Sequence, residues 1–200
     1  NKAVQEQLVE QAFPFHEVYT GIAKTSKRAV SEKTILKLQR LDLSYSSALA
    51  LSRDLFVFSY STRGMAFVDM AYLKKENIGK GILRRYLSDS SKTPYVFPII
   101  TDENPDRAYL QYQTGLNYHN QKLKRLGKLI GETLPLSSYT PRHSWATAAR
   151  NHNIPVAVIS AGMGHTSEKT TLIYLDSLDN SLIDNANNGI LKDLNSTVSW

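Results

Sequence analysis

The chain has 200 residues, of which 42% are hydrophobic and 21% charged, and these values are typical of a globular protein with one domain or at most two. It contains no cysteine, which excludes disulfide bonds, thiolate zinc sites and cysteine nucleophiles, and no apolar run approaches the roughly 18 residues of a membrane span. The formal net charge of +6 suits a polyanionic partner, although charge alone indicates neither a fold nor a reaction. We therefore expect a soluble, cytoplasmic protein.

The first third of the chain is predicted to form helices separated by irregular segments. The opening stretch NKAVQEQLVEQ has helical spacing and no initiator methionine, so we interpret residues 1–12 as the end of a linker or of a preceding domain. A second helix is expected to begin at Ser31, and a long, largely buried helix in SYSSALALSRDLFVFSYSTRG is expected to stop at Gly64. A short helix in MAFVDMAYLKK follows.

The middle of the chain contains a turn-rich stretch and then an apolar run, SDSSKTPYVFPII, followed by a loop and a long helix with a basic face. The carboxylates of that loop, in DENPD at 102–106, are explained by solvation and turn formation, so no metal site is expected. Because convincing strand alternation is scarce, the fold class is predicted to be mainly α.

The segment YTPRHSWAT predicts the start of another helix. Thr140 and Pro141 have the form of an N-cap and a first helical residue, which places Arg142 and His143 in the first turn. A cation at this end opposes the helix dipole by several tenths of a kcal/mol unless an anion joins it. A phosphate clamp and a salt bridge to a surface carboxylate are both compatible with this segment.

The segment GMGHTSEKTTLIYL predicts a tyrosine beside a cleft. A short helix is expected to end at Gly162 and Gly164, which presents His165 on the turn, and the residues 166–167 can cap the next helix. Tyr174 falls on that helix beside an apolar stripe, so its hydroxyl can reach a cleft. The stripe comprises Leu172, Leu175 and Leu178.

The order of Arg63 in YSTRGM, Arg142 in YTPRHSWAT, His165 in MGHTS and Tyr174 in TTLIYLDSL resembles the catalytic domain of the tyrosine recombinases, the phage-type integrase family, and looks most like the integrases of mobile elements. The resemblance covers nearly the whole chain. It implies a helical catalytic domain with a small β-sheet edge, which we place at residues 13–180. It also implies that the two arginines and the histidine bind the scissile phosphate of duplex DNA, and that the tyrosine attacks it.

Such a reaction would proceed through a 3′-phosphotyrosine that stores the bond energy, so the resemblance implies no metal and no cofactor. The chemistry of these residues agrees with the implied roles. A tyrosine hydroxyl with a pKa of about 10 is a poor nucleophile at neutral pH, so its attack needs the phosphate charge neutralised and the phenol proton accepted. Two guanidinium groups supply the first need without a metal ion.

The chain departs from the family pattern in two places. Tyr139 stands where the second family motif usually has a histidine, so we count it among the candidate catalytic residues, either as a hydrogen-bond donor or with no chemical role. The identity of the general base stays open, and the neighbouring His143 is either a substitute base or a packing residue. The family also carries an acid lysine on a β-hairpin, but only GKGILRR joins Ile78 to the segment around Tyr86, too short for two strands. Either the hairpin was lost or a stretch is missing from the sequence, and we favour the missing stretch. If the chain is continuous there, Lys80 is the only nearby candidate acid.

The resemblance implies duplex DNA and other recombinase protomers as partners. The C-terminal segment, residues 181–200, is expected to include a helix that docks on a neighbouring protomer or folds back. Two alternatives remain open, a type IB topoisomerase-like DNA relaxation and a non-catalytic helix-turn-helix DNA-binding protein. The residues expected to contact the DNA backbone are Lys122, Lys124, Arg125, Lys128 and His143. For the four cations of the long helix, the alternative is a solvated helix face.

Overall fold

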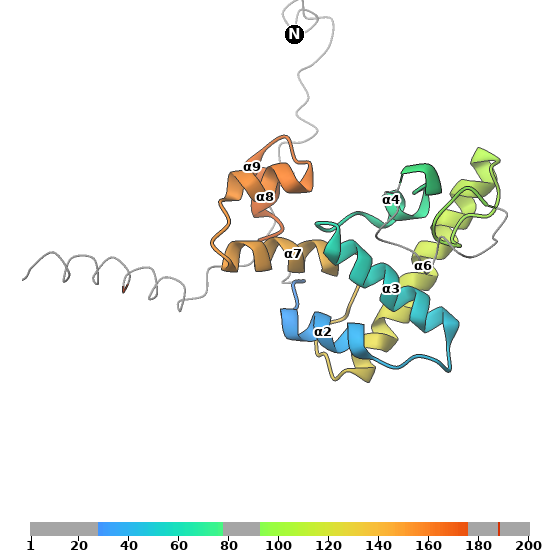
Figure 1. The fold of residues 1–200 in the computed structure, drawn as a ribbon, viewed down its shortest axis with the longest axis horizontal. Helices are drawn as coiled ribbons and strands as arrows, with labels where there is room; N and C mark the ends of the chain where they lie inside the picture. The colour runs from blue at the N-terminus through green and yellow to red at the C-terminus, as the bar shows by residue number, and fades with distance from the viewer. Residues whose placement is uncertain (1–27, 78–92, 176–187, 189–200) are drawn as a thin grey trace, which may run out of the picture.

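The computed structural model describes residues 28–77, 93–175 and 188 (Figure 1). Within these ranges the chain is mainly helical, as predicted, and its β pairing is limited to an isolated antiparallel bridge between Lys74 and Tyr95. The predictions for residues 1–12, for the interval after Ile78 and for the C-terminal helix lie outside the described residues. The elements are α2 (Glu32–Arg40), α3 (Ser47–Ser61), α4 (Phe67–Ala71), the 3-10 helix η1 (Lys75–Asn77), α6 (Pro105–Leu129), α7 (Thr140–Asn151), α8 (Val156–Met163) and α9 (Glu168–Leu172).

Side-chain caps explain where several of these helices begin. The Ser31 hydroxyl accepts a hydrogen bond from the Thr34 amide at 3.2 Å, which starts α2 at the predicted place. Asn104 caps α6 by accepting from the amides of Asp106 and Arg107 at 3.1 and 3.3 Å, and Pro105 occupies the first helical position, where no amide is needed. The predicted long helix after the carboxylate-rich loop is therefore confirmed.

Helix α3 is the centre of the fold and packs against α2, α4, α6 and α7 (Figure 1). One side of it supplies Leu55 to a core shared with α4, the 95–100 segment and α6, and another side supplies Leu49 and Phe56 to a core shared with α2 and α6. Because these two cores fix α3 along its length, they also fix the turn at its C-terminal end, where Arg63 and Gly64 lie.

Helices α7 and α8, together with the turn after α9, form a third, smaller core beside the end of α3 (Figure 1). Its buried residues are Ala146, Ile159 and Met163, and Tyr174 and Leu175 pack against them. Through the contact between α3 and α7, this unit brings the histidine turn and the tyrosine to the end of α3. None of the described helices combines the length and the apolarity needed to cross a membrane.

The start of α7 differs from the prediction by one residue. Tyr139, with φ −88° and ψ −20°, is the N-cap, and Thr140 is already helical. The Thr140 hydroxyl does not cap its own helix, because it accepts a hydrogen bond from the Ser137 amide at 2.9 Å in the preceding turn. Arg142 and His143 nevertheless remain in the first turn of α7.

The glycine-rich end of α8 and the stretch after it also differ from the prediction. Gly162 lies inside α8, and a Cβ atom there would come within 3.2 Å of the Trp145 ring, so this glycine permits close packing of α8 on α7. Gly164 ends the helix with φ +72°. Helix α9 ends at Leu172, which is 56% exposed, so this residue does not belong to an apolar stripe, and Tyr174 lies in the turn that follows the helix.

Candidate active site

Arg142 is the residue on which the candidate site is centred. From the first turn of α7, its Nη1 donates to the Gly64 carbonyl at 2.9 Å and its Nη2 donates to the Met163 carbonyl at 2.8 Å. The same Nη2 lies 2.8 Å from Nε2 of His165. The guanidinium thus joins the end of α3 to the end of α8, and its orientation is fixed by three acceptors.

The turn after α3 approaches α7 unusually closely. A Cβ atom at Gly64 would lie 2.5 Å from the Cα atom of Arg142, and Gly64 has φ +79°, so both the space and the backbone conformation require glycine. Arg63 has φ +62°, a left-handed conformation that costs a non-glycine residue about 1–3 kcal/mol. The surrounding cores hold this turn in a conformation that packs Gly64 against Arg142, and Arg63 is the residue that precedes Gly64 in the chain.

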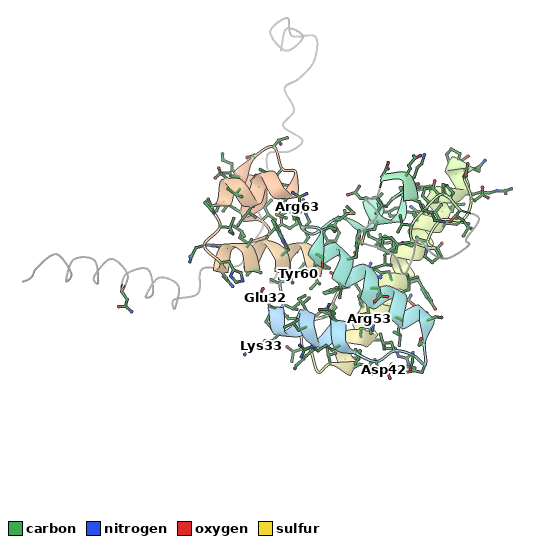
Figure 2. All side chains as sticks on the ribbon, viewed as in Figure 1. Glu32, Lys33, Asp42, Arg53, Tyr60 and Arg63 are labelled. Atoms are coloured by element: carbon green, nitrogen blue, oxygen red, sulfur yellow. The ribbon has the colours of Figure 1, made fainter. Side chains whose placement is uncertain are left out.

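Arg63 is exposed and lies where the end of α3 faces α8 (Figure 2). Its Cδ atom is 3.6 Å from the position that a Cβ atom of Gly162 would take. Within the described ranges, no carboxylate forms an ion pair with Arg63 or Arg142. Of the two alternatives for the arginine in YTPRHSWAT, the salt bridge to a surface carboxylate therefore finds no support among these residues.

His165 follows the left-handed Gly164 and lies between Arg142 and α9. Its Nε2 faces the Arg142 guanidinium, and its Nδ1 lies 2.9 Å from the hydroxyl oxygen of Thr171. Partial burial lowers the pKa of His165 below its ordinary value, and the positive charge of Arg142 lowers it further. Thr171, which the sequence motifs did not single out, is fully buried.

Tyr174 is half-buried and surrounded by the other candidate residues. Its ring stacks on His165 with 5.2 Å between the ring centroids and packs against His143 at 4.8 Å. The Cζ atom of Arg142 lies 5.3 Å from the same ring centroid, within the range of a cation–π contact. Tyr174 therefore shares one site with Arg142 and His165, although 32 positions separate it from the arginine.

His143 holds the backbone of the tyrosine and is itself only 6% exposed. Its Nδ1 lies 3.2 Å from the Tyr174 carbonyl, which can only accept, so Nδ1 is the donor. Burial lowers the pKa of His143, and Arg28 and Arg142 lower it further, against the opposing effect of the bond to the Tyr174 carbonyl. Such a buried imidazole has little surface with which to contact a DNA phosphate.

Tyr139 lies at the edge of the site and is 54% exposed. It lines a cavity of about 70 Å³ together with Arg142, Gly64 and Ala66. Its backbone carbonyl accepts the His143 amide at 3.2 Å. Tyr139, which the sequence resemblance aligns with a histidine, thus lies beside Arg142.

The basic face of α6 is separate from this site. Lys124, Arg125 and Lys128 are exposed there, and the Lys122 ammonium lies 4.4 Å above the Tyr118 ring. No interaction among the described residues joins these four cations to Arg142. In the same described ranges, no group of three histidine or carboxylate side chains is placed to hold a metal ion.

A larger cavity of about 490 Å³ lies between α3, α6 and the segment around Ile99. Its walls are mainly apolar and contain no arginine or lysine. The ionisable side chain His119 lies in its wall, and burial lowers the pKa of this imidazole to about 4, so it is neutral at pH 7. A phosphate would find no compensating charge here, which leaves the Arg142 region as the candidate active site.

Comparisons with known proteins identify the family. The model of the phage integrase family matches residues 70–181, which include Arg142, His165 and Tyr174, whereas no curated protein matches the sequence. Among solved structures, the crystal structure of XerA recombinase is similar, with a TM-score of 0.58 and 16% sequence identity over 94% of this chain and 73% of that chain. At this identity the likeness shows the fold alone. Because the family model spans more than half of the sequence, the chain belongs to the phage integrase family, and its fold is that of a tyrosine recombinase catalytic domain.

Proposed function

We propose that this chain cuts and rejoins duplex DNA at specific sites through a covalent 3′-phosphotyrosine intermediate. The observation that carries the proposal is the meeting of Arg142, His165 and Tyr174 at one point of the fold. The family membership supports a DNA recombinase, and the named roles of the residues are our inference.

The proposed phosphate site consists of Arg63 and Arg142. A guanidinium remains charged at every physiological pH, and the three acceptors around Arg142 leave two of its five N–H groups to donate to phosphate oxygens. The three acceptors around Arg142 fix its plane before DNA arrives, so less reorganisation is needed when charge develops on the phosphate. Arg63 supplies a second positive charge from the adjacent turn.

In the proposed reaction, the Tyr174 hydroxyl oxygen forms a bond to phosphorus while the bond from phosphorus to the 5′ oxygen breaks. The phenol loses its proton, and the 5′ oxygen gains one as it leaves. Around the Tyr174 ring lie two imidazoles with lowered pKa values, His143 and His165, and the unprotonated nitrogen of a neutral imidazole is a suitable proton acceptor. In His165 that nitrogen, Nε2, already accepts from Nη2 of Arg142, so this ring can take the phenol proton only by exchanging that hydrogen bond. Tyr139 has a phenol in place of an imidazole and is a poorer base at neutral pH.

The basic face of α6 is proposed to contact DNA phosphates outside the reacting centre. Its exposed cations would add affinity that falls steeply with salt and would contribute little to sequence choice. Strand exchange joins more than one cut end, so we also propose that several protomers act together on the DNA.

The test uses nicked suicide substrates that carry candidate attachment sites from the ends of the element encoding this chain. We expect a covalent protein–DNA adduct with the wild-type chain and none with Tyr174→Phe, whose DNA affinity should stay within a few-fold. A chain that forms adducts and relaxes plasmids without site preference would act as a topoisomerase. A chain that binds DNA but forms no adduct on any attachment site would be a binding protein, which would refute the proposal.

A further inference from the structure

We infer that Thr171 is a positioning residue, which fixes the tautomer and the ring orientation of His165 and, through His165, the guanidinium of Arg142. The inference rests on the proposed function for its effect on DNA cleavage. The part that concerns the tautomer of His165 rests only on contacts within the folded chain.

Thr171 contacts the candidate site through its side chain and its backbone. Its hydroxyl oxygen lies 2.9 Å from Nδ1 of His165, and its carbonyl accepts the Tyr174 amide at 2.9 Å. The side chain is fully buried in the short helix α9. One residue therefore holds both the histidine and the turn that carries the tyrosine.

The direction of the hydrogen bonds follows from the chemistry of the partners. A guanidinium has only N–H donors, so Nη2 of Arg142 must donate to Nε2 of His165 across their 2.8 Å separation. A neutral imidazole carries one proton, which must then be on Nδ1. That Nδ1–H donates to the Thr171 hydroxyl. The direction of both hydrogen bonds is thus fixed: Arg142 donates to His165, and His165 donates to Thr171.

The opposite tautomer would point an N–H of His165 at an N–H of Arg142, and the doubly protonated ring would place two positive charges side by side. Both arrangements are repulsive. The pKa of His165, lowered by partial burial and by the Arg142 charge, agrees with a neutral ring. The Thr171 hydroxyl favours the remaining arrangement, because it gives the Nδ1 proton an acceptor.

Removal of that acceptor should affect the position of Arg142. Without this acceptor, the Nδ1–H group of His165 would be left without a hydrogen bond, which favours a change of tautomer or a flip of the ring. Either change removes the Nε2 acceptor from Nη2 of Arg142. The guanidinium would keep the two carbonyl acceptors at Gly64 and Met163, but it would lose the one that faces the Tyr174 ring.

A purely structural role for Thr171 makes a different prediction. The site is buried, and valine fills nearly the same volume as threonine, so a residue needed only for packing would tolerate Thr171→Val. Thr171→Ser has the opposite character, because it keeps the hydroxyl and loses a methyl group. The neighbouring Thr170 is exposed, so Thr170→Val is a matched control that removes a hydroxyl from the same helix without touching His165.

The experiment combines two measurements on the full chain. Nitrogen NMR of protein labelled at histidine, without DNA, reports which ring nitrogen of His165 is protonated, and His165→Gln identifies the signal among five histidines. Single-turnover cleavage of a nicked suicide substrate at saturating protein reports the chemical step. We expect Nδ1–H in the wild type, in Thr170→Val and in Thr171→Ser, and loss of this single tautomer in Thr171→Val.

For cleavage, we expect Thr171→Val to be slower by roughly tenfold or more with DNA affinity within a few-fold, and Thr171→Ser and Thr170→Val to stay close to the wild type. An Nε2–H signal in the wild type would overturn the inference, as would Thr171→Val that keeps the wild-type tautomer or cleaves at the wild-type rate. If the tautomer results are as expected but the wild type forms no adduct, the proposed function fails while the positioning of His165 by Thr171 stands.

Discussion

The close approach of Gly64 to Arg142 gives a sharp test of how the site is assembled. In Gly64→Ala the new Cβ atom would lie 2.5 Å from the Cα atom of Arg142, whereas carbon atoms in contact prefer about 3.5–4.0 Å. The α3 turn and α7 must therefore separate by roughly 1 Å. Overpacking of this kind costs about 1–3 kcal/mol, and the positive φ adds about 1–2 kcal/mol.

The displacement should also be visible in the chemistry. It would disrupt the 2.9 Å bond from Nη1 of Arg142 to the Gly64 carbonyl, and a misplacement of about 1 Å at a reacting centre can cost roughly 100-fold in rate. We expect single-turnover adduct formation by Gly64→Ala to fall by about that factor. The free energy of unfolding, measured in urea, should fall by roughly 2–5 kcal/mol.

Gly131→Ala is the matched control for backbone strain. Gly131 has φ +71°, close to that of Gly64, but a Cβ atom there would have no neighbour within 4 Å. This variant should lose only about 1–2 kcal/mol of stability and cleave like the wild type. Equal cleavage rates for Gly64→Ala and Gly131→Ala would refute the view that contact with the α3 turn positions Arg142.

Three further predictions concern the residues around and outside the site. His143→Phe removes the donor to the Tyr174 carbonyl and should slow single-turnover cleavage by roughly tenfold. His143→Asn should retain more of the rate, because the asparagine amide can donate to the same carbonyl. Equal rates for the two variants would contradict a hydrogen-bonding role of His143. The folded-state pKa of His119 is about 4, below its ordinary value of 6.5, so between these pH values the unfolded chain is protonated at His119 and the folded chain is not. The free energy of unfolding should therefore fall by up to about 3 kcal/mol from pH 6.5 down to pH 4. Urea unfolding at several pH values checks this, and His119→Leu should flatten that part of the profile; a wild-type profile that is flat over the same range would show that His119 is not protonated preferentially on unfolding. On the basic face of α6, each alanine substitution should reduce the salt dependence of DNA binding by about one ion per cation removed, and an unchanged slope would indicate a solvated face; the positions are Lys124, Arg125 and Lys128.

Local signals in the sequence were strong enough to predict much of the helical architecture. The caps Ser31 and Ser167 mark helix starts because their side chains satisfy amides within the next three residues, a purely local interaction. Gly164 ends α8 for a similarly local reason, its left-handed backbone. The motifs around Arg142, His165 and Tyr174 were also recognisable, because their spacing resembles that of the family.

Features that depend on packing between distant segments were not predictable from local patterns. Thr170 and Thr171 are the same residue type side by side, and only the fold shows that Thr171 is the one turned toward His165. The prediction of an apolar stripe through Leu172 was wrong, because α9 ends at this residue and its side chain is exposed. The sequence predicted that Gly162 ends a helix, but this glycine lies inside α8 and allows the Trp145 ring to pack closely against it.

Tyr139, which the resemblance aligns with a histidine of the family motif, shows a different limit of sequence-based prediction. The sequence shows that a basic group is missing from that position but not which group takes its place. The fold adds that His143 is buried against the Tyr174 ring and that His165 stacks on it, so two imidazoles surround the proposed nucleophile. Neither contact follows from sequence spacing, because the first depends on how α7 packs against the turn after α9, and the second on how the turn after α8 packs against it.

The most direct test of the central claim is to map the covalent bond itself. Wild-type protein trapped on a nicked suicide substrate is digested, and mass spectrometry locates the residue that carries the DNA 3′-phosphate. We predict that this residue is Tyr174 and that Tyr174→Phe gives no adduct at any position. A nucleotide found on another residue, or an adduct that persists in Tyr174→Phe, would contradict the assignment of Tyr174 as the nucleophile.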